Sequence, residues 1–141
     1  MKIVRSILIA FAFLFVVSSA HAQTSTVKAA IPFSFVVDKS ALPAGDYTLG
    51  SILTGSRAVA VRDLDQPSYS VVTVPNACAL REPSKTTKLV FHRLGNQYFL
   101  YQIWIEGQSF GREFPMSKLE IQMAKNQPKA EEVIVAALLV R

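Results

Sequence analysis

Two largely apolar runs separated by Gly95-Asn96 form the clearest structural pattern in the chain. A two-residue loop with glycine first, between runs rich in β-branched and aromatic residues, predicts a tight β-hairpin of strands 88–94 and 97–105. The loop also sets the register, in which Val90 lies opposite Tyr101.

The alternation of side chains divides this predicted hairpin into two faces. One face holds Val90, His92, Phe99, Tyr101, Ile103 and Ile105. The other face holds Leu89, Phe91, Tyr98, Leu100 and Trp104. Because both faces are largely apolar, we expect strands that are covered on both sides.

The rest of the chain reads as further short strands separated by turn residues. Expected strands are 27–37, either as an edge strand or as two short strands divided at Pro32, followed by 47–53, 58–61, 69–74, 77–80, a third meander strand to 114, and 132–140. Ser117 and Glu120 form a capping box, which predicts a short helix to about Lys125. The pattern therefore predicts an all-β fold: a single antiparallel sandwich or small flattened barrel of about seven to eight strands, with one short helix near the C-terminus.

The first residues predict export. Lys2 and Arg5 precede an unbroken apolar run, 7–17, and Ala20-His21-Ala22 fits the small-residue pattern of a signal-peptidase site. The run is shorter than the roughly 20 residues of a membrane-spanning helix. We therefore expect a signal peptide over 1–22, a single β-rich domain over 23–141 without a transmembrane segment, and a periplasmic or extracellular location.

The distribution of charge and the cysteine count indicate which kinds of binding partner the protein can have. The chain has 15 Lys and Arg against 10 Asp and Glu, but the basic residues are scattered along the mature part. Nucleic-acid binding usually needs a basic stripe or patch, so we expect no nucleic-acid partner. Cys78 is the only cysteine, so no internal disulfide exists. Oligomers could still form through Cys78 or through an edge strand at Pro32.

The mature sequence resembles a group of small, uncharacterised, secreted proteins from soil bacteria. The resemblance is carried by Ile31-Pro32-Phe33 with Phe35, Leu42-Pro43-Ala44-Gly45 with Tyr47, Leu89-Val90-Phe91-His92-Arg93 through Gly95, Tyr98-Phe99-Leu100, Ile103-Trp104, and Gly111-Arg112 with Pro115, Ser117 and Glu120. These motifs cover most of the mature chain. The resemblance implies a secreted, single-domain protein and supplies no catalytic residues.

The residues offer little catalytic or metal-binding chemistry. His92 is the only histidine after the predicted cleavage site, whereas a transition-metal site usually needs at least two His or Cys ligands. We therefore expect no metal and no cofactor. A secreted hydrolase could be assembled only from scattered groups around His92, with Glu106, Glu113 or Glu120 reaching it from afar.

Binding is the function that the sequence favours. Leu89, Phe91, Tyr98, Leu100 and Trp104 form an apolar face that is either core or an exposed interaction site. The main hypothesis is an exported, non-enzymatic β-domain that binds a ligand or an envelope protein. A hydrolase around His92 and a purely structural envelope subunit are the alternatives.

Overall fold

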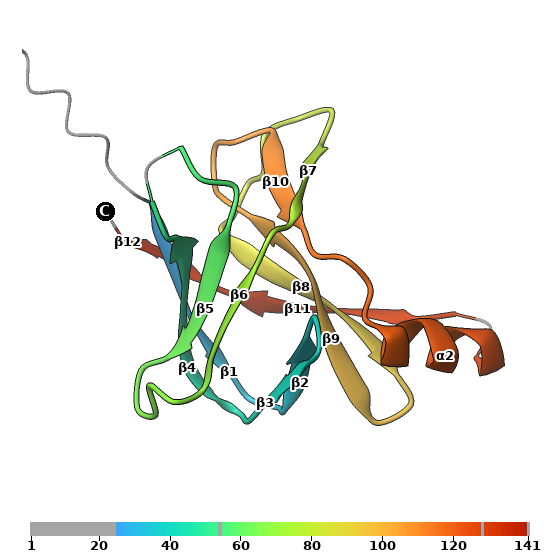
Figure 1. The fold of residues 1–141 in the computed structure, drawn as a ribbon. Coiled ribbons are helices and arrows are strands. Elements are labelled where there is room, and N and C mark those ends of the chain that lie inside the picture. The colour runs from blue at the N-terminus through green and yellow to red at the C-terminus, as the bar shows by residue number, and fades with distance from the viewer. Residues whose placement is uncertain (1–24, 54, 128, 141) are drawn as a thin grey trace, which may run out of the picture.

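The computed structural model describes residues 25–53, 55–127 and 129–140 of the 141-residue chain. The predicted signal peptide, 1–22, lies outside the described residues. Within them the chain forms two β-sheets and one short helix, so the predicted all-β sandwich is confirmed (Figure 1). No helix in this described part is long and apolar enough to cross a membrane.

The first sheet has the strand order β12-β1-β4-β5-β6 and is antiparallel throughout. Its strands are β1 Thr26–Ile31, β4 Gly45–Ser51, β5 Val59–Asp63, β6 Ser70–Thr73 and β12 Leu138–Val140. The alternate residues of β1 and β4 that face the second sheet are buried, as expected for a sheet covered on one side.

The second sheet has the order β11-β8-β9-β10-β7, and β2 joins it through one parallel bridge to β9. Its strands are β7 Asn76–Ala79, β8 Lys88–Leu94, β9 Gln97–Trp104, β10 Phe110–Glu113, β11 Glu131–Ala136, β2 Phe35–Val37 and β3 Ser40–Leu42. Helix α2, Lys118–Asn126, packs beside β8 near the hairpin turn (Figure 1).

The described residues contain more strands than the seven or eight that the sequence predicts. Pro32 ends β1, and the chain resumes as β2 in the other sheet. The last run is likewise divided at Ala137: β11 pairs with β8 in one sheet, and β12 pairs with β1 in the other. Strands that pass between two sheets bend at such corners, so one apolar run serves both layers.

The run around Pro32 forms two short strands, β1 and β2, which is one of the two arrangements that the proline predicted. Strand β1 pairs with β4 from Thr26 to Ile31 but with β12 only from Thr26 to Lys28, so among the described strands Ala29–Ile31 pair with β4 alone. Pro32 lies just beyond the end of β1, where its missing N–H interrupts no ladder.

The Gly95-Asn96 hairpin is confirmed, but its register holds only near the turn. Gly95 has φ +59°, which favours glycine, and Leu94 pairs with Gln97 as predicted. A register shift between Val90 and Phe91 then introduces an extra residue on β9, so Val90 pairs with Gln102 rather than with Tyr101. Because the extra residue is on β9, the β9 side chains beyond the bulge lie on the opposite face from the one that simple alternation predicts.

Candidate functional site

The five residues of the predicted binding face are not exposed as a group. Leu89 and Phe91 are fully buried and Leu100 is 3% exposed, all within the core between the sheets. Tyr98 is half-buried and stacks on Phe33 with ring centroids 3.9 Å apart. These four residues pack inside the sandwich.

Trp104 does not share that face, which corrects the predicted alternation. It pairs with Lys88 beyond the bulge, on the outer face of the sheet. The indole is only 4% exposed, and its Nε1 donates to Gln102 Oε1 at 3.0 Å. A Cβ at Gly111 would come within 2.6 Å of the indole carbons, so the ring lies directly against the backbone of β10. The bulge explains the difference, since it shifts Ile103 to the inner face and Trp104 to the outer face.

A cleft lies between the two sheets of the described structure, and the sequence did not reveal it. Its volume is about 470 Å³. One wall comes from the first sheet and the adjoining loops, and the other from β7, β9, β10 and the turn before β10. The cleft is lined by Ser25, Val27, Leu49, Gly50, Ser51, Gly55, Val59, Ala77, Ile103, Ile105, Gln108, Phe110, Gly111 and Arg112.

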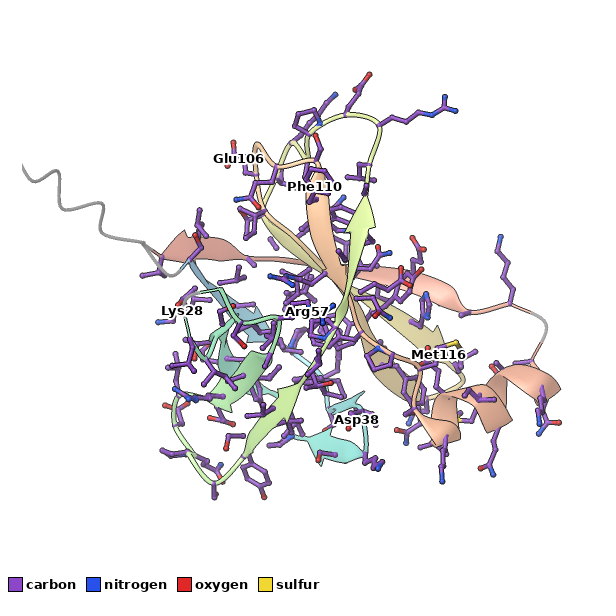
Figure 2. All side chains as sticks on the ribbon, turned by 45° about the horizontal axis from the view of Figure 1, so that its top comes forward. Lys28, Asp38, Arg57, Glu106, Phe110 and Met116 are labelled. Atoms are coloured by element: carbon purple, nitrogen blue, oxygen red, sulfur yellow. The ribbon has the colours of Figure 1, made fainter. Side chains whose placement is uncertain are left out.

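Apolar side chains dominate the cleft, and the most exposed of them lies at its rim. Val27, Leu49 and Val59 are almost completely buried at the base of the cleft. Phe110 is 70% exposed. Figure 2 shows Phe110 with Glu106 at the end of the molecule formed by β10, far from Asp38. A concave, largely apolar surface with a few polar groups is typical of ligand sites.

Among the described residues that line the cleft, Arg112 is the only charged one. It pairs with Ile103 of β9 and with Ala77 of β7, so its side chain shares their inner face. The next residue, Glu113, points to the opposite face, where its Oε2 accepts a hydrogen bond from Gln102 Nε2 at 2.9 Å. The nearest carboxylate in sequence is thus directed away from the guanidinium.

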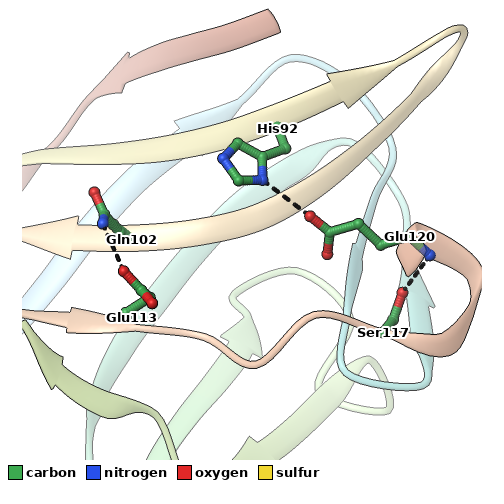
Figure 3. A network of polar contacts seen from close by, with 5 residues as sticks. All are labelled: His92, Gln102, Glu113, Ser117 and Glu120. Atoms are coloured by element: carbon green, nitrogen blue, oxygen red, sulfur yellow. Dashed lines mark hydrogen bonds and ion pairs between the residues drawn. The ribbon is translucent and has the colours of Figure 1, made fainter. Parts of the chain in front are cut away.

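His92 forms a separate polar site on the outer face of the second sheet (Figure 3). Its Nδ1 lies 2.9 Å from Glu120 Oε1, and its ring stacks on Tyr101 with centroids 3.8 Å apart. Glu120 is only 3% exposed. This is one of the three carboxylates that the sequence analysis considered for His92, although 28 residues separate the two in the chain.

The capping box explains how Glu120 reaches the sheet. The backbone N–H of Glu120 donates to Ser117 Oγ at 3.0 Å, which confirms Ser117 as the N-cap of α2 (Figure 3). The Ser117 hydroxyl is thereby bound to the helix and lies on the far side of Glu120 from His92. The arrangement fixes the ring of His92, but it presents no nucleophile to it.

Two further titratable groups of the outer face, Tyr101 and Cys78, have raised pKa values. Burial, followed by the nearby Glu113 carboxylate, raises the pKa of Tyr101. Burial and the charge of Glu113 also raise the pKa of the half-buried Cys78 thiol. A raised pKa leaves the thiol protonated and poorly nucleophilic at neutral pH. Among the described residues, no three His, Cys, Asp or Glu side chains are placed to hold a metal ion.

A second hollow, of about 530 Å³, lies at the bend between β11 and β12. It is lined by Thr86, Thr87, Glu106, Ala136, Ala137, Leu138 and Leu139. His92 lines neither this hollow nor the cleft. Comparisons with protein-family models, with curated proteins and with solved structures find no match to this chain. Its function must therefore be inferred from the geometry of its own residues.

Proposed function

We propose that this protein is an exported, non-enzymatic binding module of the cell envelope or the extracellular space, and that its ligand site is the cleft between the sheets. The observation that carries the proposal is the cleft itself: about 470 Å³, open to solvent at Phe110 and apolar at its base. This volume lies within the range of roughly 300–1,000 Å³ that is common for small-molecule sites.

The chemistry of the lining favours binding over catalysis. Among the described residues that line the cleft there is no His, Cys, Asp or Glu. Ser25 and Ser51 supply hydroxyls, but a serine nucleophile needs an adjacent base. Apolar walls and one guanidinium are groups that hold a ligand.

The proposal can be tested with a substitution that fills the cleft with a larger side chain. Ala77 is exposed on β7 and lines the cleft, so Ala77→Phe places a ring in the open space. Ala41→Phe on β3 is the matched control, because Ala41 is also an exposed strand alanine but lies outside the cleft. We expect the mature protein and the control to enhance the fluorescence of anilinonaphthalene sulfonate, and Ala77→Phe to lose most of that enhancement. Equal enhancement in all three proteins would contradict the proposed site.

Export is tested by the mature N-terminus. The A-x-A pattern places cleavage after Ala22, so mass spectrometry of the exported protein should give a chain that begins at Gln23. An exported product that retains 1–22 would contradict this part of the proposal.

A hydrolase is the second candidate, and the His92–Glu120 contact is the observation in its favour. A carboxylate hydrogen-bonded to a histidine orients the ring as a general base would require. If His92 were such a base, hydrolysis of p-nitrophenyl acetate would fall in His92→Gln but not in His21→Gln, which is removed with the signal peptide. We expect no hydrolysis that depends on His92.

A further inference from the structure

Arg112 defines the class of ligand that the cleft should accept. An arginine side chain stays charged at every physiological pH and offers a planar fork of N–H donors. The ion pairs of the described residues are His92–Glu120 and Arg93–Glu131, and neither includes Arg112. The part of the lining that the structure describes holds no acidic side chain. Arg112 thus brings an uncompensated positive charge to the wall of the cleft.

The walls around Arg112 are hydrocarbon. Ile103, the partner of Arg112 on β9, is 6% exposed. On the first sheet the lining residues include Val27, Leu49 and Val59. A charge beside apolar surface is desolvated in part, and burying it is favourable only if an opposite charge with hydrogen-bonding oxygens accompanies it. The ligand that satisfies both features has an apolar body and one anionic group.

We infer that the cleft binds a single-chain anionic amphiphile, with a carboxylate on the Arg112 guanidinium and an aliphatic or aryl body between the sheets. A carboxylate accepts two parallel hydrogen bonds from one guanidinium, which gives both strength and direction. The apolar body occupies the space bounded by Val27, Leu49 and Ile103. This inference rests on the proposed function, since it names the ligand class of the same cleft.

The first experiment uses the unaltered mature protein. Decanoate, decanol and decyltrimethylammonium share one chain and differ in the charge of the head group. Each would displace anilinonaphthalene sulfonate at concentrations below micelle formation. We expect decanoate to bind about 10- to 100-fold more tightly than decanol, the range that a charge-assisted hydrogen-bonded pair supplies. We expect the cationic probe to bind most weakly, since it meets the like charge of Arg112. Equal affinity of decanoate and decanol would overturn the inference.

The second experiment removes the guanidinium group of Arg112. Arg112→Gln should lose the preference for decanoate over decanol while keeping the affinity for decanol, and Arg112→Lys should keep only part of the preference. Arg93→Gln is the matched control, because Arg93 lies on the neighbouring hairpin, over the ring of Tyr98 and outside the cleft. A preference that survives in Arg112→Gln would overturn the inference.

Failure of the inference and failure of the proposed function give different results. If Ala77→Phe abolishes binding of every probe but Arg112→Gln changes nothing, the cleft is a ligand site without a carboxylate preference. If Ala77→Phe leaves decanoate and decanol binding intact, the cleft is not the site and both proposals fall. Because the head-group comparison is made first in the unaltered protein, it does not depend on any variant folding.

Discussion

The two ends of the sandwich are built from the same two sheets but are filled differently. At one end, which we term the aromatic end, Phe33, Phe35, Tyr47, Phe91 and Tyr98 interlock, with ring centroids between 3.9 and 5.5 Å apart. At the other, the open end, the facing side chains are Val27, Leu49, Val59 and Ile103, and a cleft of about 470 Å³ remains. Figure 1 shows β2 and β3 at the first end and β7 and β10 at the second.

On the proposed function, this difference separates the residues that stabilise the fold from the residues that bind the ligand. Aromatic rings bury large areas and lock the sheets together through edge-to-face and stacked contacts. The smaller aliphatic side chains belong to the same core cluster but fill less of the space between the sheets, and the cleft remains beside them. We therefore expect substitutions at the aromatic end to change the free energy of unfolding, and substitutions at the open end to change ligand binding.

The largest expected effect is the loss of a ring at the aromatic end. Phe91 is fully buried and packs edge-on against both Phe33 and Phe35. Phe91→Ala should lower the free energy of unfolding by about 3–5 kcal/mol, since it leaves a cavity. Phe110→Ala at the open end should change it by less than about 0.5 kcal/mol, because Phe110 is largely exposed. Urea unfolding of the two variants checks the contrast, and similar losses would remove the distinction between the ends.

A smaller loss of stability is expected for a substitution at Gly111, which lies between the cleft and the indole of Trp104. Gly111 lines the cleft, and a Cβ there would lie 2.6 Å from the indole of Trp104 and 2.7 Å from the backbone oxygen of Ile103. Gly111→Ala should cost about 1–3 kcal/mol as the indole and the strand are displaced. The measurement is urea unfolding together with near-ultraviolet circular dichroism, which reports the single tryptophan. An unchanged spectrum and an unchanged free energy of unfolding would mean that Trp104 and the backbone of β9 accommodate the added methyl group at no cost.

The smallest effect concerns the pH dependence of the aromatic end. Asp63 Oδ1 accepts from the N–H groups of Gln66 and Asp65, and these hydrogen bonds, that of Gln66 first, hold the pKa of Asp63 below its usual range. Because the pKa is lower in the folded state, this stabilisation is present above the unfolded pKa and is lost as pH falls through the folded pKa. Asp63→Asn should thus be less stable than the parent at neutral pH.

That difference in stability should shrink as the solution is acidified, and urea unfolding at several pH values would follow it. Asp46→Asn is a control at the start of the neighbouring strand, for an exposed carboxylate. A difference between parent and Asp63→Asn that stays constant with pH would show that the charge of Asp63 contributes nothing to folding.

Local patterns predicted much of the fold. The Gly95-Asn96 turn, the capping box of Ser117 and the β-branched runs each depend on neighbouring residues, and the structure has all three. The bulge after Val90 could not be predicted in this way. A bulge depends on how the strands pack on their neighbours. Because of it, Trp104 lies on the opposite face of the sheet from the one that the sequence pattern predicted.

The candidate site was beyond the reach of the sequence for a related reason. Val27, Leu49, Phe110 and Arg112 line one cleft, although Val27 and Arg112 are far apart in the sequence. Nothing in the spacing of such residues marks a cleft, because a cleft is the space that facing side chains leave unfilled. The contact of His92 with Glu120 is similar: the capping box predicts the helix, but only packing brings that helix onto β8.

By itself, the sequence determined the class of the fold, the hairpin turn, the start of the helix and the absence of a disulfide. These follow from period-two alternation, from backbone preferences and from a cysteine count, all of which act over a few residues or none. Tertiary structure alone decided which strands share a sheet, which face each side chain occupies beyond the bulge, and where the two sheets part to leave the cleft beside Arg112. Those outcomes depend on how side chains that are distant in sequence fill the space between the two sheets, which is a property of the packed chain as a whole.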